Sequence, residues 1–226
     1  MAKVHGVAGE WARVRGTVFS LWPLFLSFVL LGAFLAALLL GAGVWLFGGL
    51  FIAALIAVSV YWRKGLRRVE SFFRGARGEE RVANVLARLP EPYHVFHDFV
   101  AGREHVDHVV AGPVGVFSVE TKSWQGKVEI VEGHLLVNGA LPSRDPVAQA
   151  RRQADQVRAT LKRLGYGGTV VPMVCFASDT FASDPTACGP VKVLNAKALA
   201  DWFAAQPQTV PPNDLARLVQ TMETGR

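Results

Sequence analysis

Residues 18–62 contain no Asp, Glu, Lys or Arg, and most of their side chains are apolar. This run of about 45 residues is long enough for two helical spans of roughly 20 residues each. The sequence therefore predicts a transmembrane helical hairpin, with spans at residues 18–40 and 44–62 and a turn at residues 41–43. A secretory signal peptide is excluded, because its apolar core is only about 7–15 residues long. The alternatives to a membrane hairpin are a single long hydrophobic helix and a buried helical pair in a soluble protein.

Basic segments flank this apolar run on both sides, at residues 1–17 and 63–74. Because Lys and Arg next to membrane spans stay cytoplasmic, both segments are expected inside, in a multi-pass protein of the cell (inner) membrane. The basic side chains after the second span favour contact with the lipid bilayer, with nucleic acid as the alternative partner. Small residues in the hairpin would also allow a homo-oligomer through close helix packing, namely Gly32, Gly41, Gly43, Gly48 and Gly49.

A second pattern lies further along the chain, where two runs rich in Val and Phe flank a Gly-containing loop at residues 112–115. Such runs predict a β-hairpin. If the loop has those four residues, Ala111 faces Val116, and Asp107 falls directly opposite Glu120. Like charges that face each other across antiparallel strands are destabilising.

Lys122 is expected on the same strand face as Glu120, because side chains alternate along a strand. Two carboxylates and an amine would therefore converge on one spot. A hard, oxygen-binding cation such as Mg²⁺ or Mn²⁺ would relieve the repulsion between Asp107 and Glu120. The alternative is an ordinary solvated strand face on which opposite charges alternate.

The apolar neighbours of these residues favour the functional interpretation. Val109, Ala111, Val116 and Ser118 are expected on the charged face, and Val106, Val110, Phe117 and Val119 on the other. A hairpin that is apolar on both sides is expected to be buried on both sides. Charged side chains in such a strand need partners or a function.

The remaining pattern predicts a sheet flanked by helices, and hence an α/β domain. Strands are expected at residues 93–100, 127–131, 135–137, 169–177 and 191–194, and helices at 69–89, 145–165, after Asn195 and after Pro212. Glu79 and Glu80 lie in the early turns of the first of these helices. Gln149 and Gln153 are four residues apart and share one side of the helix expected at 145–165. Another side of this helix is basic, and it is either solvated or in contact with phosphate.

Three stretches, at residues 75–83, 106–126 and 145–150, resemble the nuclease-related domain (NERD) family of the PD-(D/E)XK nuclease superfamily. The resemblance implies a mixed central sheet flanked by helices, as in restriction endonucleases, with a divalent metal site. The family's acidic residues match Asp107 and Glu120, and its lysine matches Lys122. Glu79 matches the helix glutamate of the family, and Gln149 matches its glutamine. Asp145 stands where the family usually has Asn.

The resemblance also implies roles for these residues. Asp107, Glu120 and the carbonyl of Thr121 would bind Mg²⁺ or Mn²⁺, and Lys122 would orient or deprotonate the attacking water. Glu79 would bind metal or position water, and Gln149 would hold Lys122 or a phosphate. Together these expectations describe a membrane-anchored, metal-dependent nuclease acting on nucleic acid, DNA in particular.

The predicted organisation has four parts: a cytosolic segment at 1–17, the transmembrane hairpin at 18–62, a basic linker at 63–74 and the nuclease-related domain at 75–226. Two other functions stay open. The domain would be a non-catalytic module that binds nucleic acid or protein, or the chain would be a membrane scaffold in which the oligomerising hairpin is the functional part.

Overall fold

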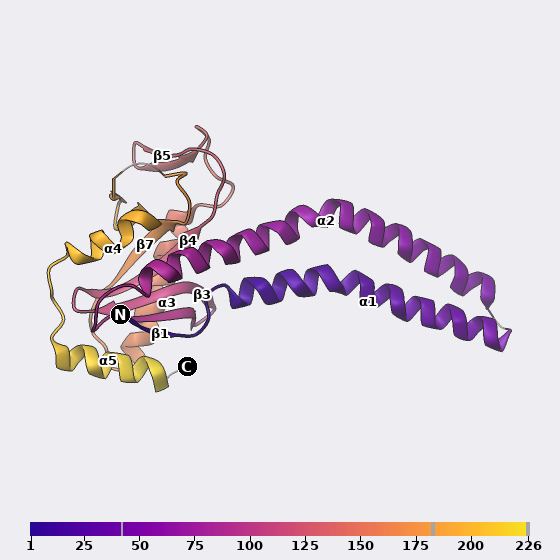
Figure 1. Cartoon of the computed structure of the whole chain (residues 1–226), viewed down its shortest axis with the longest axis horizontal. Coiled ribbons are helices and arrows are strands. Elements are labelled where there is room, and N and C mark those ends of the chain that lie inside the picture. Colours follow the sequence, from indigo (N-terminus) through magenta and orange to yellow (C-terminus); the bar gives the residue numbers. More distant parts are fainter. Residues whose placement is uncertain (42, 182–183, 225–226) are drawn as a thin grey trace. The chain divides into compact units, whose positions relative to one another are not determined.

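The computed structural model describes residues 1–41, 43–181 and 184–224 and divides them into two compact units. The sheet domain comprises residues 1–10 and 75–226, and the helix pair comprises residues 11–74. Figure 1 shows a sheet with helices in the first unit and two long helices in the second. The fold is therefore α/β, as predicted.

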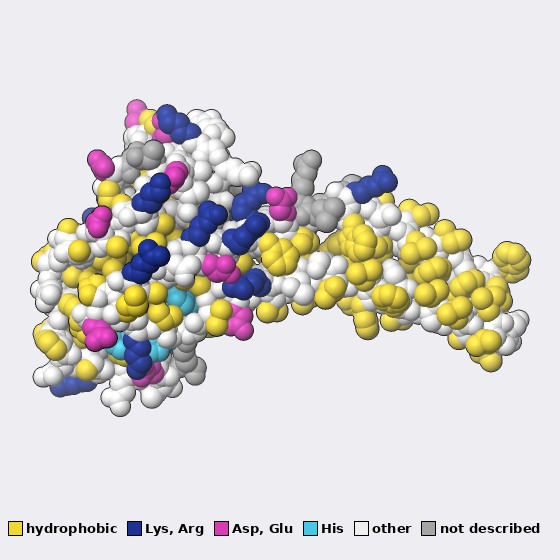
Figure 2. Space-filling model, viewed as in Figure 1, with side chains coloured by type: hydrophobic (Ala, Val, Ile, Leu, Met, Phe, Trp, Pro, Cys, Tyr) yellow, Lys and Arg dark blue, Asp and Glu magenta, His cyan; other side chains and the backbone are white. Residues whose placement is uncertain are grey.

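The helix pair consists of α1 (Glu10–Leu40) and the first part of α2 (Val44–Leu86). Both helices are long and apolar enough to cross a membrane, with mean hydropathies of 2.5 for Glu10–Leu40 and 2.2 for Val44–Arg63. Figure 2 shows hydrophobic side chains over much of their surface. The helices pack through aromatic rings, since Phe34 and Phe51 stack with centroids 6.1 Å apart.

Helix α2 differs from the sequence-based expectation in its length. Residues 63–74, expected as a linker, lie inside this one helix, which also contains most of the helix expected at 69–89. No Pro interrupts the segment, so the hydrogen-bonded helix continues from the apolar half into the charged half. Residue 42 of the predicted turn, and the side chains of Lys64, Arg67 and Arg68, lie outside the described residues.

The sheet domain is built on a seven-stranded mixed sheet in the order β1-β2-β3-β4-β7-β9-β8. Its strands are β1 (Lys3–His5), β2 (His94–Ala101), β3 (Glu104–Gly112), β4 (Gly115–Lys122), β7 (Val170–Phe176), β8 (Thr186–Cys188) and β9 (Val191–Asn195). The central β4, β7 and β9 run parallel, and β2, β3 and β4 form an antiparallel meander. A separate hairpin joins β5 (Val128–Val131) to β6 (His134–Val137).

Helices cover both faces of this sheet. On one face, the end of α2 and α4 (Ala196–Ala204) pack through Val82, Leu86, Leu199 and Phe203. On the other, α3 (Pro146–Arg163) and α5 (Pro212–Thr224) pack through Val157, Leu161, Leu215 and Leu218. The predicted N-caps are confirmed, since Asp145 and Asn195 accept backbone N–H groups at the starts of α3 and α4.

The hairpin has the predicted register but a tighter turn. Ala111 pairs with Val116, as expected, and Gly112 also pairs with Gly115. Only Pro113 and Val114 therefore form the connection, in place of a four-residue loop. The three-residue strands β1 and β8 at the two edges of the sheet were not predicted, because so short a segment carries no usable periodicity.

The prediction of the face on which Val106 lies was wrong. Val106 packs in the same cluster as Val109, although residues three apart on a regular strand point to opposite faces. The neighbouring strand shows the same break, because Phe96 and Phe99 also share that cluster. Asp98 lies within this second break and has a positive φ of 48°, which interrupts the alternation of β2.

Close packing of α2 against the sheet depends on Gly78. A Cβ at this position would overlap the Ser123 hydroxyl and lie 3.3 Å from the Cβ of Ala177. A Cβ at Gly75, one turn earlier, would meet nothing within 4 Å, so this position serves as a matched comparison. The two glycines therefore separate the effect of packing from that of helix propensity.

We predict that Gly78→Ala lowers the free energy of unfolding by about 1–3 kcal/mol, because an added methyl overpacks the contact. Gly75→Ala should raise it by up to about 1 kcal/mol through helix propensity. Denaturant unfolding of the full chain in detergent measures both. Equal effects of the two changes would contradict the proposed close approach at Gly78.

Candidate active site

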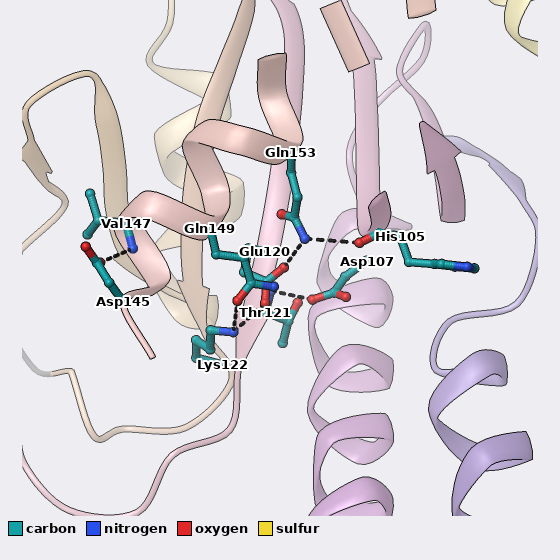
Figure 3. A network of polar contacts seen from close by, with 9 residues as sticks. All are labelled: His105, Asp107, Glu120, Thr121, Lys122, Asp145, Val147, Gln149 and Gln153. Carbon is teal, nitrogen blue, oxygen red and sulfur yellow. Dashed lines mark hydrogen bonds and ion pairs between the residues drawn. The ribbon is translucent and has the colours of Figure 1, made fainter. Parts of the chain in front are cut away.

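The site forms where the ladder between β3 and β4 stops. The last pair of this ladder is His108 with Val119, one residue short of Asp107 and Glu120. Beyond it, Asp107 Oδ2 accepts a hydrogen bond of 2.7 Å from the backbone N–H of Thr121 (Figure 3). The carboxylate of Asp107 therefore contacts the main chain of β4 directly after Glu120.

Both carboxylate oxygens of Glu120 are held by neighbouring side chains. Lys122 Nζ donates to Oε1 in an ion pair, and Gln153 Nε2 donates to Oε2 over 2.6 Å. Lys122 Nζ also donates to Gln149 Oε1 over 3.0 Å, and Gln153 donates to the carbonyl of His105 over 3.0 Å. Figure 3 shows how one side of α3 closes over the charged residues of β4.

Four of the predicted side chains thus form one connected region, since Gln149 reaches Lys122, Lys122 reaches Glu120, and Asp107 contacts the next residue of the same strand. Gln153 received no role from the sequence, although it makes the second contact to Glu120 and is buried. Its spacing of four residues from Gln149 was the available signal, because such residues lie one above the other on a helix.

Glu79 approaches the region from α2. Its pKa is raised to about 7 by burial, and then by the negative charges of Asp98 and Glu120. A hydrogen bond with the backbone of Gly9 and the positive charge of Lys122 act in the opposite direction. Glu79 therefore belongs to the same electrostatic group as the acids of the hairpin, and it titrates close to neutral pH.

Asp107 is half-buried, and its pKa lies well above the ordinary value. Burial is the largest cause, followed by the charges of Glu120 and Glu79, while the Thr121 N–H and Lys122 offset part of the effect. Negative charge in this region exceeds what a single lysine can balance. A buried excess of this kind raises the free energy of the folded state unless a proton or a cation neutralises it.

Asp98 is a further acid that sequence reasoning missed. The sequence His97-Asp98 on β2 runs antiparallel to Asp107-His108 on β3, and His97 pairs with His108. The histidine Nδ1 atoms lie 2.8 Å apart, and burial lowers the pKa of His108 well below its usual value. The charge of Asp98 acts on Glu79, which lies on a different element of the fold, so neither segment's own pattern indicates this proximity.

The donor atoms suit a hard divalent cation. Asp107 and Glu120 supply carboxylate oxygens, which Mg²⁺ and Mn²⁺ prefer, and the excess of negative charge favours their binding. Among the described residues, a set of three His, Cys, Asp or Glu donors within 4.8 Å of one another occurs elsewhere, at His5, His94 and Glu223. At the hairpin, Asp107 and Glu120 are the candidate carboxylate ligands, and backbone oxygen or water would complete the shell of an ion.

Comparison with known proteins finds a family match over the same part of the chain. Residues 74–177 match the family model of the nuclease-related domain, NERD. An uncharacterized protein of Bacillus anthracis is 33% identical over 83 residues, which cover 34% of this chain and 39% of that relative. No solved structure matches the chain. The match spans the hairpin, both glutamines and Glu79, and it confirms the resemblance seen in the motifs: residues 74–177 are similar to the nuclease-related domain.

Proposed function

We propose that this protein is a membrane-anchored, metal-dependent nuclease that hydrolyses phosphodiester bonds, in DNA in particular. The observation that carries the proposal is the half-buried Asp107 next to the buried Glu120, whose carboxylate is paired with the amine of Lys122, within the region that matches the nuclease-related domain. Perturbed carboxylates that are gathered with a lysine are typical of catalytic sites.

Asp107 and Glu120 are the side chains that would hold Mg²⁺ or Mn²⁺, with the carbonyl of Thr121 as a further ligand. When bound, such an ion polarises the scissile phosphate and lowers the pKa of a coordinated water. The protein's own contribution is to hold the two carboxylates in fixed positions before substrate arrives. The hydrogen bond from Thr121 to Asp107 and that from Gln153 to Glu120 serve this purpose.

Lys122 would orient the attacking water and offset negative charge that develops on the phosphate. Gln149 positions the amine of Lys122 through the contact of 3.0 Å between them. Glu79, with a pKa of about 7, is suited to accept a proton from water near neutral pH. These assignments give Asp107, Glu120, Lys122 and Glu79 one role each in the hydrolysis.

Nucleic acid would approach through a surface hollow of about 450 Å³ that is lined in part by Gln149, the residue that contacts Lys122. Gln149, Arg144 and Arg152 line this hollow together with Glu104. The guanidinium of Arg152 is 3.9 Å from Glu104, and its side chain is 61% exposed, so it can turn toward a phosphate. Arginine binds phosphate oxygens with two parallel hydrogen bonds, which suits it to hold the backbone next to the scissile bond.

The helix pair would anchor the nuclease in the lipid bilayer. Strand β1 precedes α1 and pairs with β2, so the segments before and after the helix pair both belong to the sheet domain. An even number of spans would leave both segments on the same side of the membrane, and the two apolar helices are consistent with this number. The basic residues near their ends favour the cytoplasmic side of the inner membrane. Oligomerisation through this hairpin stays a prediction.

One observation favours the alternative of a non-catalytic module on a nuclease-like fold. Glu120 is already paired with Lys122 and Gln153 through both oxygens, so this network can persist without a cation. Such a module would use the same arginine-lined hollow to bind nucleic acid without cleaving it. A nuclease would cleave bound nucleic acid when metal is added, whereas a non-catalytic module would bind it and leave it intact.

We predict that the full chain in detergent cleaves DNA with Mg²⁺ or Mn²⁺ and that EDTA abolishes the cleavage. Asp107→Asn, Glu120→Gln and Lys122→Ala should each reduce the rate by at least about 100-fold, because each removes a group that acts on the reacting phosphate. Asp201→Asn, at an exposed position of α4, is the matched control and should retain the rate.

Retained cleavage in all three site variants would contradict the proposed mechanism. DNA binding without cleavage in either metal, with plasmid and linear substrates, would identify the non-catalytic module instead. Linear and closed circular DNA also distinguish an endonuclease from an exonuclease, because only an endonuclease can cleave the closed circle.

The charge excess predicts how stability depends on pH in the metal-free protein. The folded protein binds the Glu79 proton more tightly than the unfolded chain does, so stability falls as pH rises from about 4.5 to about 7. Glu79→Gln should raise the free energy of unfolding at pH 8 by about 1–3 kcal/mol and weaken this fall. Asp201→Asn, at an exposed position of α4, is again the control.

Denaturant unfolding in EDTA at pH 5.5 and pH 8 measures this effect. A wild-type protein equally stable at both values, together with no gain from Glu79→Gln, would show that the acids are not in electrostatic conflict.

We further predict that Arg144→Gln with Arg152→Gln weakens DNA binding and reduces its salt dependence by up to about 2 in the slope of log affinity against log salt. Lys162→Gln with Arg163→Gln removes the same charge from the last turn of α3 and should change the slope less. Anisotropy titrations in EDTA measure binding without cleavage. If both pairs of substitutions reduced DNA affinity and its salt dependence equally, the DNA would bind along the whole of α3, which would refute binding at a specific hollow.

A further inference from the structure

Three potential metal ligands from distant parts of the sequence meet at the β1 edge of the sheet. His5 lies on β1, His94 at the start of β2, and Glu223 in the last turn of α5. His5 Nε2 is 3.3 Å from His94 Nδ1, and His5 Nδ1 is 3.6 Å from Glu223 Oε1. One donor atom from each residue lies within 4.8 Å of the other two.

The spacing of the two imidazoles fits a tetrahedral ion. Zn–N bonds of about 2.0–2.1 Å place two nitrogens on such an ion about 3.3–3.4 Å apart, which is the separation observed between His5 and His94. Packing fixes the ring of His5, because it stacks on Phe96 with centroids 4.3 Å apart. The two imidazoles are therefore held at a suitable spacing before any ion binds.

The chemistry of the set also suits a transition metal. Metal binding requires neutral imidazole, and burial together with the charge of Lys3 lowers the pKa of His94. Glu223 supplies a negative charge and is partly exposed, so its carboxylate can turn to an ion. Lys3 Nζ lies 3.3 Å from Glu223 in the structure, but its side chain is 65% exposed and can move into solvent.

We propose that His5, His94 and Glu223 form a second metal site, which takes Zn²⁺ or a similar cation that prefers nitrogen ligands. The site is separate from the acids of the hairpin, whose oxygen donors suit Mg²⁺ or Mn²⁺. Three protein ligands leave one position of a tetrahedral ion for water.

The bound ion would clamp the N-terminal strand to the C-terminal helix. Strand β1 has only three residues and pairs with one neighbour, so its own ladder is weak. It is also the segment from which the chain enters α1. A metal clamp at this edge would therefore hold the point where the apolar helix pair joins the sheet domain, independently of whether the nuclease site is active.

The test uses the full chain in detergent, stripped with EDTA, in an Asp107→Asn and Glu120→Gln background that disables the hairpin site. Calorimetry with Zn²⁺ should give one ion per chain, and Co²⁺ should give the intense visible absorption of a tetrahedral complex. Unfolding should shift to higher temperature with Zn²⁺ but not with Mg²⁺, since ligand binding stabilises the folded state.

His5→Ala and His94→Ala should each weaken Zn²⁺ binding by at least about 100-fold, because loss of a partner that only supports a ligand already costs about 10–100-fold. His134→Ala, at the exposed β5–β6 turn, is the matched control. Glu223→Gln tests the site with an exposed residue that leaves folding intact. Zn²⁺ affinity and Co²⁺ absorption that are the same in all site variants as in the control, or no binding at all, would overturn the proposal.

Discussion

Buried negative charge at the open end of the β3–β4 hairpin is the constraint on which the rest of the sheet domain depends. The ladder stops before Asp107 and Glu120, and the freed N–H of Thr121 is donated to Asp107. This hydrogen bond keeps a half-buried carboxylate in place although burial and the charge of Glu120 raise its pKa. A site of this kind is poised to take up positive charge, and its stability is expected to respond to protons and cations alike.

Each surrounding element supports this constraint in its own way. Helix α3 holds the amine of Lys122 through Gln149 and the carboxylate of Glu120 through Gln153. Helix α2 brings in Glu79, and the missing side chain of Gly78 lets the helix approach the end of β4. In this fold several acids surround one lysine, and the neutral amides of Gln149 and Gln153 hold Lys122 and Glu120 in position.

The sequence was sufficient for the parts that depend on local pattern. The hairpin register, the caps of α3 and α4 and the mixed sheet all follow from periodicity, turn residues or motif resemblance. The face of Val106 and the contribution of Asp98 could not be predicted, because both arise from a shared break in β2 and β3 that neither strand encodes alone. Strand β1 was missed for a similar reason, since its three residues form a strand only by pairing with β2.

The central claim is that Asp107 and Glu120 hold a divalent cation between them, beside Lys122. Anomalous scattering from crystals of the protein soaked in Mn²⁺ tests it most directly. The account predicts an anomalous peak within bonding distance of both carboxylates, which disappears in Asp107→Asn crystals. A map with no peak at the hairpin, in crystals that take up Mn²⁺ elsewhere, would contradict it.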